Sequence, residues 1–379
     1  MEKTISLISP LLPPLEEFIP YLEQIWQSRH LTNNGPFLRE LEIALADYLG
    51  VEFLSLFNNG TTALITALKG CGVKGEVITT PYSFVATANS LMWNGLTPVF
   101  VDIEKHSFNL DPQKIESAIT PQTTAILPVH CYGHPCNVEQ IQRVADRHDL
   151  RVIYDAAHAF GVNDAGGSVL RHGDMSVLSF HATKVFNTFE GGAIICADAV
   201  TKRQIDELRN FGFVDEVTVN SCGINGKMSE INAAFGLLQL RHIDVALQKR
   251  KNIDRLFREL LCSVEGIKVA AAASNHSYFP ILVEAQFPLS RDALYHVLKK
   301  NDILARRYFF PLINDLAAYR TLSSHDRHPL PVATEAANQV ICLPMHANLE
   351  PRDIARIIAV IRGCASVSTF SPSLPTGAY

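Results

Sequence analysis

The sequence lacks several features that would assign it to a broad class at once. None of its apolar runs approaches the roughly 20 residues that a membrane-spanning helix needs. The formal net charge of -5 gives no basic excess that would favour nucleic acid or an acidic membrane as a partner. The start, MEKTISLISPLLPPLEEF, lacks the basic-then-apolar order of a signal peptide. The eight cysteines form no CxxC pair, which favours reduced thiols. We therefore expect a cytoplasmic protein with no nucleic-acid or membrane partner.

Apolar runs and helical patterns alternate through roughly the first half of the chain. Continuous apolar runs are typical of strands buried on both faces of a parallel sheet, joined by crossover helices. We expect helices at 61–70 and 137–150, and strands at 51–57, 76–80, 98–103, 123–130, 151–157, 176–180 and 191–197. The pattern predicts an α/β domain with a large, mostly parallel sheet, to which we assign residues 1–240 with an N-terminal arm.

The second half of the chain has a different pattern. A long helical segment begins at about Ser229 and is expected to link two domains. Residues 241–365 favour a smaller C-terminal α+β domain, with strands at 266–270, 277–285 and 304–310 and helices at 290–302 and 351–365. Residues 366–379 are rich in Ser, Pro and Thr, and we expect a disordered tail.

Ligands of open parallel sheets bind beyond the carboxyl ends of the strands, so the residues there are candidates for a site. Gly60 and Thr61 follow the first expected strand and open a helix, where free N–H groups favour a phosphate; a plain helix cap is the alternative. Phe84 follows the second strand and could stack on a flat ligand or pack in the core.

Two charged residues complete a set at the same edge. Asp155 ends an apolar strand, where a carboxylate needs a cationic or hydrogen-bonding partner. Lys184 lies in SFHATKVFNTFEGG (179–192), between two apolar runs; taken alone it could be a solvated surface lysine. Together, a phosphate site, an aromatic face, a carboxylate and a lysine match the needs of pyridoxal phosphate.

The segment HCYGHPC has the residue types of a zinc site. Its side chains are His130, Cys131, His134 and Cys136, but no second half follows at the spacing of a zinc finger. We expect a turn after a strand and no metal.

Eight segments in order, from about residue 8 to about residue 363, resemble the DegT/StrS family of sugar-nucleotide aminotransferases. They are LTNNGPFLRELE, NNGTTAL, EVITTPYSFVATAN, PVFVDIE, ILPVHCYGHPCNV, VIYDAAHAFG, SFHATKVFNTFEGGAI and GINGKMSEINAAFG. The resemblance implies the aspartate aminotransferase fold, pyridoxal 5'-phosphate as cofactor, and a homodimer with shared active sites.

The resemblance also implies roles for individual residues. Lys184 would form the Schiff base and move the proton, Asp155 would pair with the pyridine nitrogen, and His158 would lie close to the cofactor; these three are the catalytic candidates. The implied cofactor-binding residues are Gly60, Thr61, Phe84, Asp155, His158, Ser179, Lys184 and, reaching the neighbouring subunit's phosphate, Asn225. A minority of the family has histidine in place of the lysine and catalyses deoxygenation, so Lys184 favours transamination.

The substrate is less sharply indicated. Candidate substrate contacts are Asn34, His181, Arg306 and Tyr308. The sequences of several segments are most similar to those of TDP-4-keto-6-deoxyglucose 4-aminotransferases. This similarity implies glutamate as amino donor and a role in surface polysaccharide (O-antigen) biosynthesis. A 3-keto sugar, a UDP- or GDP-sugar, and an inert pyridoxal-phosphate-binding regulator remain alternatives. A plain nucleotide-binding module would need GxGxxG after the first strand, and NNGTTAL does not have it.

Overall fold

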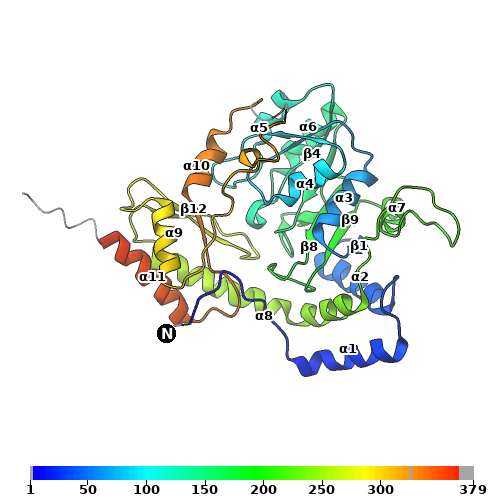
Figure 1. The fold of residues 1–379 in the computed structure, drawn as a ribbon, viewed down its shortest axis with the longest axis horizontal. Helices are drawn as coiled ribbons and strands as arrows, with labels where there is room; N and C mark the ends of the chain where they lie inside the picture. The colour runs from blue at the N-terminus through cyan, green and yellow to red at the C-terminus, as the bar shows by residue number, and fades with distance from the viewer. Residues whose placement is uncertain (1–2, 323, 325–326, 367–379) are drawn as a thin grey trace, which may run out of the picture.

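A seven-stranded sheet forms the centre of the larger part of the protein (Figure 1). The computed structural model describes residues 3–322, 324 and 327–366. The strand order is β1-β9-β8-β5-β4-β2-β3. All seven strands predicted in the first half of the chain are present: β1 (Phe53–Phe57), β2 (Glu76–Thr79), β3 (Thr97–Phe100), β4 (Thr123–Leu127), β5 (Arg151–Asp155), β8 (Met175–Ser179) and β9 (Gly192–Cys196). The predicted α/β fold is confirmed.

One strand runs against the others. β9 pairs antiparallel with both β8 and β1, and Gly192 at its start lies opposite Ser179 and Phe57, the last residues of those strands. β2, β3, β4, β5 and β8 pair in parallel. The start of β9 therefore meets the carboxyl ends of its neighbours, and residues before β9 reach the same edge of the sheet.

Helices cover both faces of this sheet. On one face, Leu54 and Leu56 of β1 share a core with α2 (Pro36–Leu49) and the start of α8 (Glu230–Leu261). On the other face, Phe57 packs with α3 (Gly60–Gly70) and α7 (Ala199–Arg209). Because both faces are buried, the strands are apolar at successive positions and show no alternation. The other helices of this part are α1 (Leu15–Ser28), α4 (Ala86–Trp93), α5 (Pro112–Ile115) and α6 (Val138–His148).

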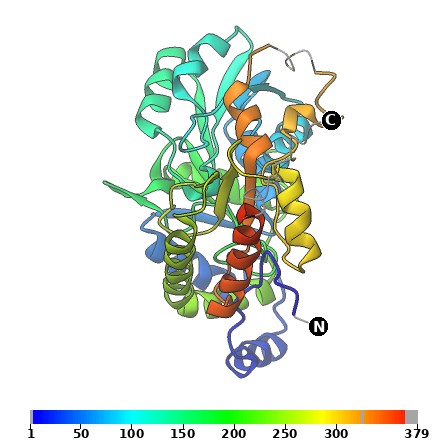
Figure 2. The ribbon, with the colours of Figure 1, turned by 90° about the vertical axis from the view of Figure 1, so that its left-hand side faces the viewer.

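The predicted long helix, α8, has 32 residues and connects the two halves of the molecule (Figures 1 and 2). Its first half packs on α1 and α2, and its second half packs on α11 (Pro351–Ser366) and on the second sheet. Arg250, buried in its middle, donates to the carbonyl oxygens of Met345 at 3.1 Å and of Ser277 at 3.4 Å. These contacts tie the helix to the C-terminal half.

A three-stranded antiparallel sheet lies in that half. Its strands are β10 (Ile267–Val269), β11 (Phe279–Val283) and β12 (Val340–Leu343), with α9 (Arg291–Lys300) and α10 (Pro331–Gln339) nearby. The two-domain division at residue 240 stays a prediction. No helix in the described part of the chain combines the length and apolar character needed to cross a membrane.

The strand predicted at 304–310 is wrong. Only Arg306 bridges the sheet there, to Cys342, and the segment then turns away. Phe309 leaves the sheet because its ring packs against Tyr82 at 5.6 Å between centroids and stacks on Tyr132 at 5.9 Å. β12 occupies the position in the sheet that was expected for residues 304–310. The sequence analysis missed β12 because a run of only four residues directly after a helix is too short to show the period of a strand. The predicted tail begins one residue too early, since Ser366 still belongs to α11; residues 367–379 lie outside the described residues.

Candidate active site

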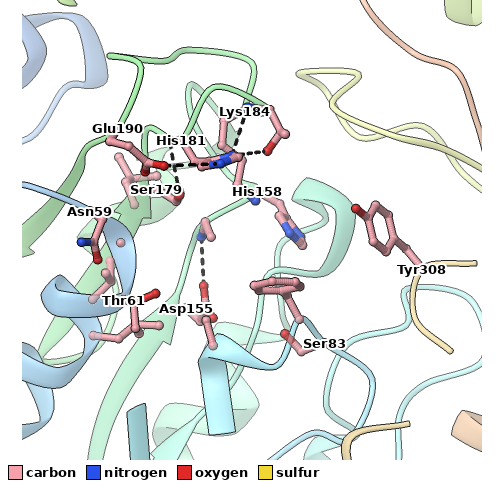
Figure 3. Close-up of a pocket in the computed structure, with 18 of the residues that line it drawn as sticks. Asn59, Thr61, Ser83, Asp155, His158, Ser179, His181, Lys184, Glu190 and Tyr308 are labelled. Carbon is pink, nitrogen blue, oxygen red and sulfur yellow. Dashed lines mark hydrogen bonds and ion pairs between the residues drawn. The ribbon is translucent and has the colours of Figure 1, made fainter. Parts of the chain in front are cut away.

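A cavity of about 240 Å³ opens at the carboxyl edge of the large sheet (Figure 3). Nine of the side chains predicted for the site line it: Gly60, Thr61, Phe84, Asp155, His158, Ser179, His181, Lys184 and Tyr308. They come from the ends of β1, β2, β5 and β8 and from a segment of the C-terminal half. The topology thus brings together residues that are far apart in the sequence.

The N-terminus of α3 forms one end of the cavity. Asn59 caps the helix by accepting a hydrogen bond from Thr62 N at 2.8 Å. The first N–H groups of a helix have no partner within it and carry its positive dipole end, and here they belong to Gly60 and Thr61. The hydroxyl-bearing residues Thr61 and Ser179 also line this end. Free N–H donors, hydroxyls and the helix dipole suit a phosphate group.

The close packing of Ser179 against position 60 requires a glycine there. A Cβ added at Gly60 would lie 2.9 Å from Cβ of Ser179, closer than such atoms approach. We expect Gly60→Ala to displace Ser179 or the start of α3 and to weaken cofactor binding by about tenfold or more. Equilibrium dialysis with pyridoxal phosphate measures this. Gly363→Ala is the matched control, since an added Cβ there meets nothing within 4 Å; equal affinities for both variants would contradict the role assigned to Gly60.

Asp155 is buried at the end of β5. Its Oδ2 accepts a hydrogen bond from the Thr87 hydroxyl at 2.7 Å, and its Oδ1 accepts one from Ala157 N at 3.1 Å. Burial raises the pKa of Asp155, while these hydrogen bonds and the charge of Lys184 act in the opposite direction. A carboxylate in such a place is stabilised by a cationic N–H, which a protonated pyridine ring provides.

Lys184 also lines the cavity. Its Nζ makes no hydrogen bond or ion pair with any residue that the structure describes, although its backbone N donates to His181 O at 2.8 Å. Burial lowers the pKa of Lys184 to about 8, against the opposing effect of Asp155. A lysine amine that is partly neutral near neutral pH is a nucleophile and a base. Lys184 is therefore not an ordinary surface cation.

His158 and Phe84 supply aromatic rings to the cavity. His158 is buried, and its Nδ1 accepts a hydrogen bond from Tyr132 N at 3.2 Å. Burial and the nearby Lys184 hold the pKa of His158 well below its usual value, so the ring is neutral and carries its proton on Nε2. Phe84 is exposed to the extent of 56%, which is unusual for a core phenylalanine and leaves its ring available to a flat ligand.

Several polar residues near the cavity mouth complete the site. His181 Nδ1 lies 2.8 Å from the Thr183 hydroxyl, and His181 Nε2 lies 3.6 Å from Oε1 of Glu190 (Figure 3). Tyr308 lies on the opposite side of the cavity (Figure 3), and its ring centroid is 6.1 Å from that of Tyr278, which also lines the cavity. The sequence analysis missed Thr183, Glu190 and Tyr278. Glu190 directly precedes the glycines that open β9, and it reaches the cavity only because β9 runs antiparallel to its neighbours.

Three predicted site residues do not line this cavity. Asn34 is exposed in the turn before α2, where its carbonyl oxygen accepts from Arg39 Nη1 at 2.6 Å. Arg306 is exposed, with its backbone bridged to Cys342. Asn225 is exposed on the segment after α7. None of the three lines the cavity of its own chain; a role for them in the site remains a prediction.

The side chains of HCYGHPC make local contacts. His130 Nδ1 accepts from Cys136 N at 3.0 Å, and the His130 ring stacks on Tyr154 at 4.7 Å. The ring nitrogen Nε2 of His134 lies 3.1 Å from the carbonyl oxygen of Ala271. The segment thus forms the turn after β4 and packs it on the sheet.

Residues 15–362 match the profile of the DegT/DnrJ/EryC1/StrS aminotransferase family. The chain belongs to this family. It is 59% identical over 366 residues to the dTDP-4-amino-4,6-dideoxy-D-glucose transaminase of Shigella dysenteriae, covering 96% of this chain and 99% of that one. It is 55% identical over 369 residues to the transaminase of the same name from Escherichia coli, covering 96% and 99%. A solved structure of DesI with its TDP-sugar product superimposes with a TM-score of 0.93 at 35% identity, covering 97% of this chain and 94% of DesI.

The cofactor of this aminotransferase is pyridoxal 5'-phosphate. The residues of the site fit it. The N-terminus of α3 with Gly60, Thr61 and Ser179 would hold the phosphate, Asp155 would hold the ring nitrogen, and Lys184 would hold the aldehyde carbon. The Lys184 amine has no hydrogen-bond partner among the described residues, and the buried Asp155 carboxylate forms no ion pair with them. A bound cofactor would provide a partner for both groups.

Proposed function

We propose that the protein transfers an amino group from glutamate to the C4 carbon of dTDP-4-keto-6-deoxy-D-glucose, forming dTDP-4-amino-4,6-dideoxy-D-glucose. The observation that supports this most directly is the unpartnered Lys184 amine in a cavity with Asp155 and the α3 N-terminus. The choice of sugar rests on 59% identity to a transaminase named for this product.

Each catalytic side chain has a defined task. When bound, pyridoxal phosphate supplies an aldehyde that carries the amino group and a ring that stabilises negative charge on the reacting carbon. Lys184 Nζ takes up and returns a proton, which requires a neutral amine, and a pKa of about 8 leaves part of the amine neutral near neutral pH. Asp155 Oδ1 or Oδ2 holds the proton on the ring nitrogen. The neutral His158 offers an Nε2 proton to the cavity.

The substrate would be held at the mouth of the cavity. A sugar presents hydroxyl groups, which donate to carboxylates and accept from imidazole N–H groups. Glu190 and His181 offer this combination on one side, and Tyr308 offers an aromatic face and a hydroxyl on the other. Asn34 and Arg306 are assigned to the more distant nucleotide.

We further propose a homodimer with shared active sites. The segment after α7 projects from the body of the protein (Figure 1) and exposes apolar side chains, namely Phe211, Phe213, Val217 and Val219. Exposed apolar side chains gathered on one projection favour a protein interface. Asn225 lies at the base of this projection and is assigned to the partner subunit's phosphate site.

The cellular role follows from the product. An amino-dideoxy sugar on dTDP is an activated donor, and we assign it to the assembly of a surface polysaccharide such as O-antigen. We place the enzyme in the cytoplasm, which its eight unpaired cysteines favour.

The test uses the visible absorbance of the bound cofactor. Glutamate alone should convert the purified protein to the colourless amino form, and dTDP-4-keto-6-deoxy-D-glucose should then restore the colour; 3-keto, UDP-linked and GDP-linked sugars should restore it at least about tenfold more slowly. Faster recovery with one of these sugars would reassign the substrate. A spectrum that glutamate leaves unchanged would instead favour an inert regulatory protein.

A further inference from the structure

Two buried hydroxyl groups lie in line with Asp155. The Thr87 hydroxyl donates to Asp155 Oδ2 at 2.7 Å, and the Ser83 and Thr87 hydroxyl oxygens lie 2.8 Å apart. Thr87 is fully buried in the first turn of α4 and does not line the cavity, whereas Ser83 and Asp155 do (Figure 3). Any effect of Thr87 on a bound ligand is therefore exerted through its neighbours.

The direction of these hydrogen bonds follows from the charge on Asp155. An ionised carboxylate only accepts, so the Thr87 hydroxyl proton must point at Asp155. Because the Thr87 hydroxyl proton is already used in this hydrogen bond, Ser83 must be the donor in the hydrogen bond between Ser83 and Thr87. The result is one ordered chain, from Ser83 to Thr87 to Asp155, and it leaves only lone pairs of the Ser83 oxygen facing the cavity.

The hydrogen bond of Thr87 differs from the usual one in a helix. A buried helical threonine ordinarily donates to the carbonyl oxygen four residues earlier, as Thr66 of α3 does to Thr62 O at 2.8 Å. Thr87 donates to the side chain of a residue 68 positions away instead. The Thr87 hydroxyl is therefore satisfied by a side chain of the cavity and not by the backbone of its own helix.

The electrostatic effect on Asp155 has a clear direction. Burial raises the pKa of Asp155, and the Thr87 hydrogen bond counteracts it. Charge-assisted hydrogen bonds are short and strong, and they fix the plane of a carboxylate as well as its charge. Ala157 N holds the other oxygen at 3.1 Å, so both oxygens have a fixed direction before any ligand binds.

We propose that Thr87 is a positioning residue for the cofactor, which together with Ser83 keeps the Asp155 carboxylate ionised and oriented toward the ring nitrogen. This inference rests on the proposed function, because it assumes that Asp155 meets a pyridine nitrogen. It adds two residues that never need to touch the reacting atoms.

The test is the protonation of the cofactor ring. Thr87→Val removes the hydroxyl and keeps the shape, and pyridoxal phosphate labelled with ¹⁵N in the ring reports whether that nitrogen is protonated. In Thr87→Val the ¹⁵N shift should move toward the unprotonated value, and the glutamate half-reaction should slow about ten- to a hundredfold. Thr87→Ser, which restores a hydroxyl, should stay within about threefold of wild type, and Ser83→Ala should show a smaller shift in the same direction.

The outcomes separate this inference from the proposed function. A wild-type ¹⁵N shift and rate in Thr87→Val would overturn it. If Thr87→Val fails to fold, as circular dichroism would show, Ser83→Ala decides, and a wild-type shift in that variant overturns the ordered chain. The ¹⁵N shift of the cofactor ring is measured without glutamate or sugar. A result that excludes the proposed keto sugar would therefore refute the proposed substrate without affecting this measurement.

Discussion

Replacing Lys184 with alanine is expected to reduce amino transfer by roughly 10⁴- to 10⁶-fold, the largest effect that we expect from any single substitution. The reason is that one amine has two tasks. Lys184 is the nucleophile for the cofactor and the base that moves a proton, and Nζ of this residue is the amine that the structure leaves without a partner in the cavity. Neither task has a substitute among the neighbouring side chains, since His158 is held neutral and its Nδ1 already accepts a hydrogen bond.

Two measurements check this expectation. Steady-state amino transfer gives the rate, and mass spectrometry after borohydride treatment shows whether the cofactor is covalently attached. The wild type should carry the cofactor mass on the peptide that contains Lys184, and Lys184→Ala should carry none. Lys69→Ala is the matched control, an exposed lysine at the end of α3, and should keep both properties. Cofactor attached to a different lysine in the wild type would refute the assignment.

Much of this site could be predicted because its residues follow the ends of strands. Gly60, Asp155 and Ser179 lie within three residues of the end of β1, β5 or β8, and parallel strands bring such positions to one edge. The seven strands themselves were predicted because burial on both faces makes them continuously apolar. The sequence pattern alone did not indicate that β9 runs antiparallel, and so Glu190, which precedes β9, was missed.

Other residues could not be found from the sequence for a physical reason. Thr87 lies in the first turn of α4, and only the three-dimensional fold brings its hydroxyl to Asp155 at the end of β5. Tyr278 comes from the C-terminal half, and no local pattern shows which of its aromatic residues turns toward the cavity. Asn225 was predicted from the resemblance and Arg306 as a possible substrate contact, and the cavity of a single chain includes neither residue. The strand expected at 304–310 failed because the aromatic packing of Phe309 outweighs its preference for a strand.

Replacing Asp155 with asparagine is expected to slow amino transfer by roughly 10²- to 10³-fold while the cofactor stays attached to Lys184. Asparagine keeps the size of the side chain and removes the charge that holds a proton on the ring nitrogen. The amide oxygen can still accept from Ala157 N, and the amide NH2 can donate to the Thr87 hydroxyl oxygen, so the fold around it should survive. A loss of rate with retained attachment separates Asp155 from Lys184, whose loss abolishes both.

The control for this substitution lies at the other end of the same strands. Asp174 precedes β8 and bonds Arg151 Nη1 and Val152 N, both at 2.8 Å, at the edge of the sheet away from the cavity. Asp174→Asn removes one charge from the same pair of strands and should leave the rate within about twofold of wild type. The glutamate half-reaction, followed by the loss of cofactor absorbance in a stopped-flow instrument, measures both variants without any sugar. Equal rates for Asp155→Asn and the wild type would mean that the ring nitrogen needs no carboxylate, and the Asp155 role would then be wrong along with the positioning role of Thr87.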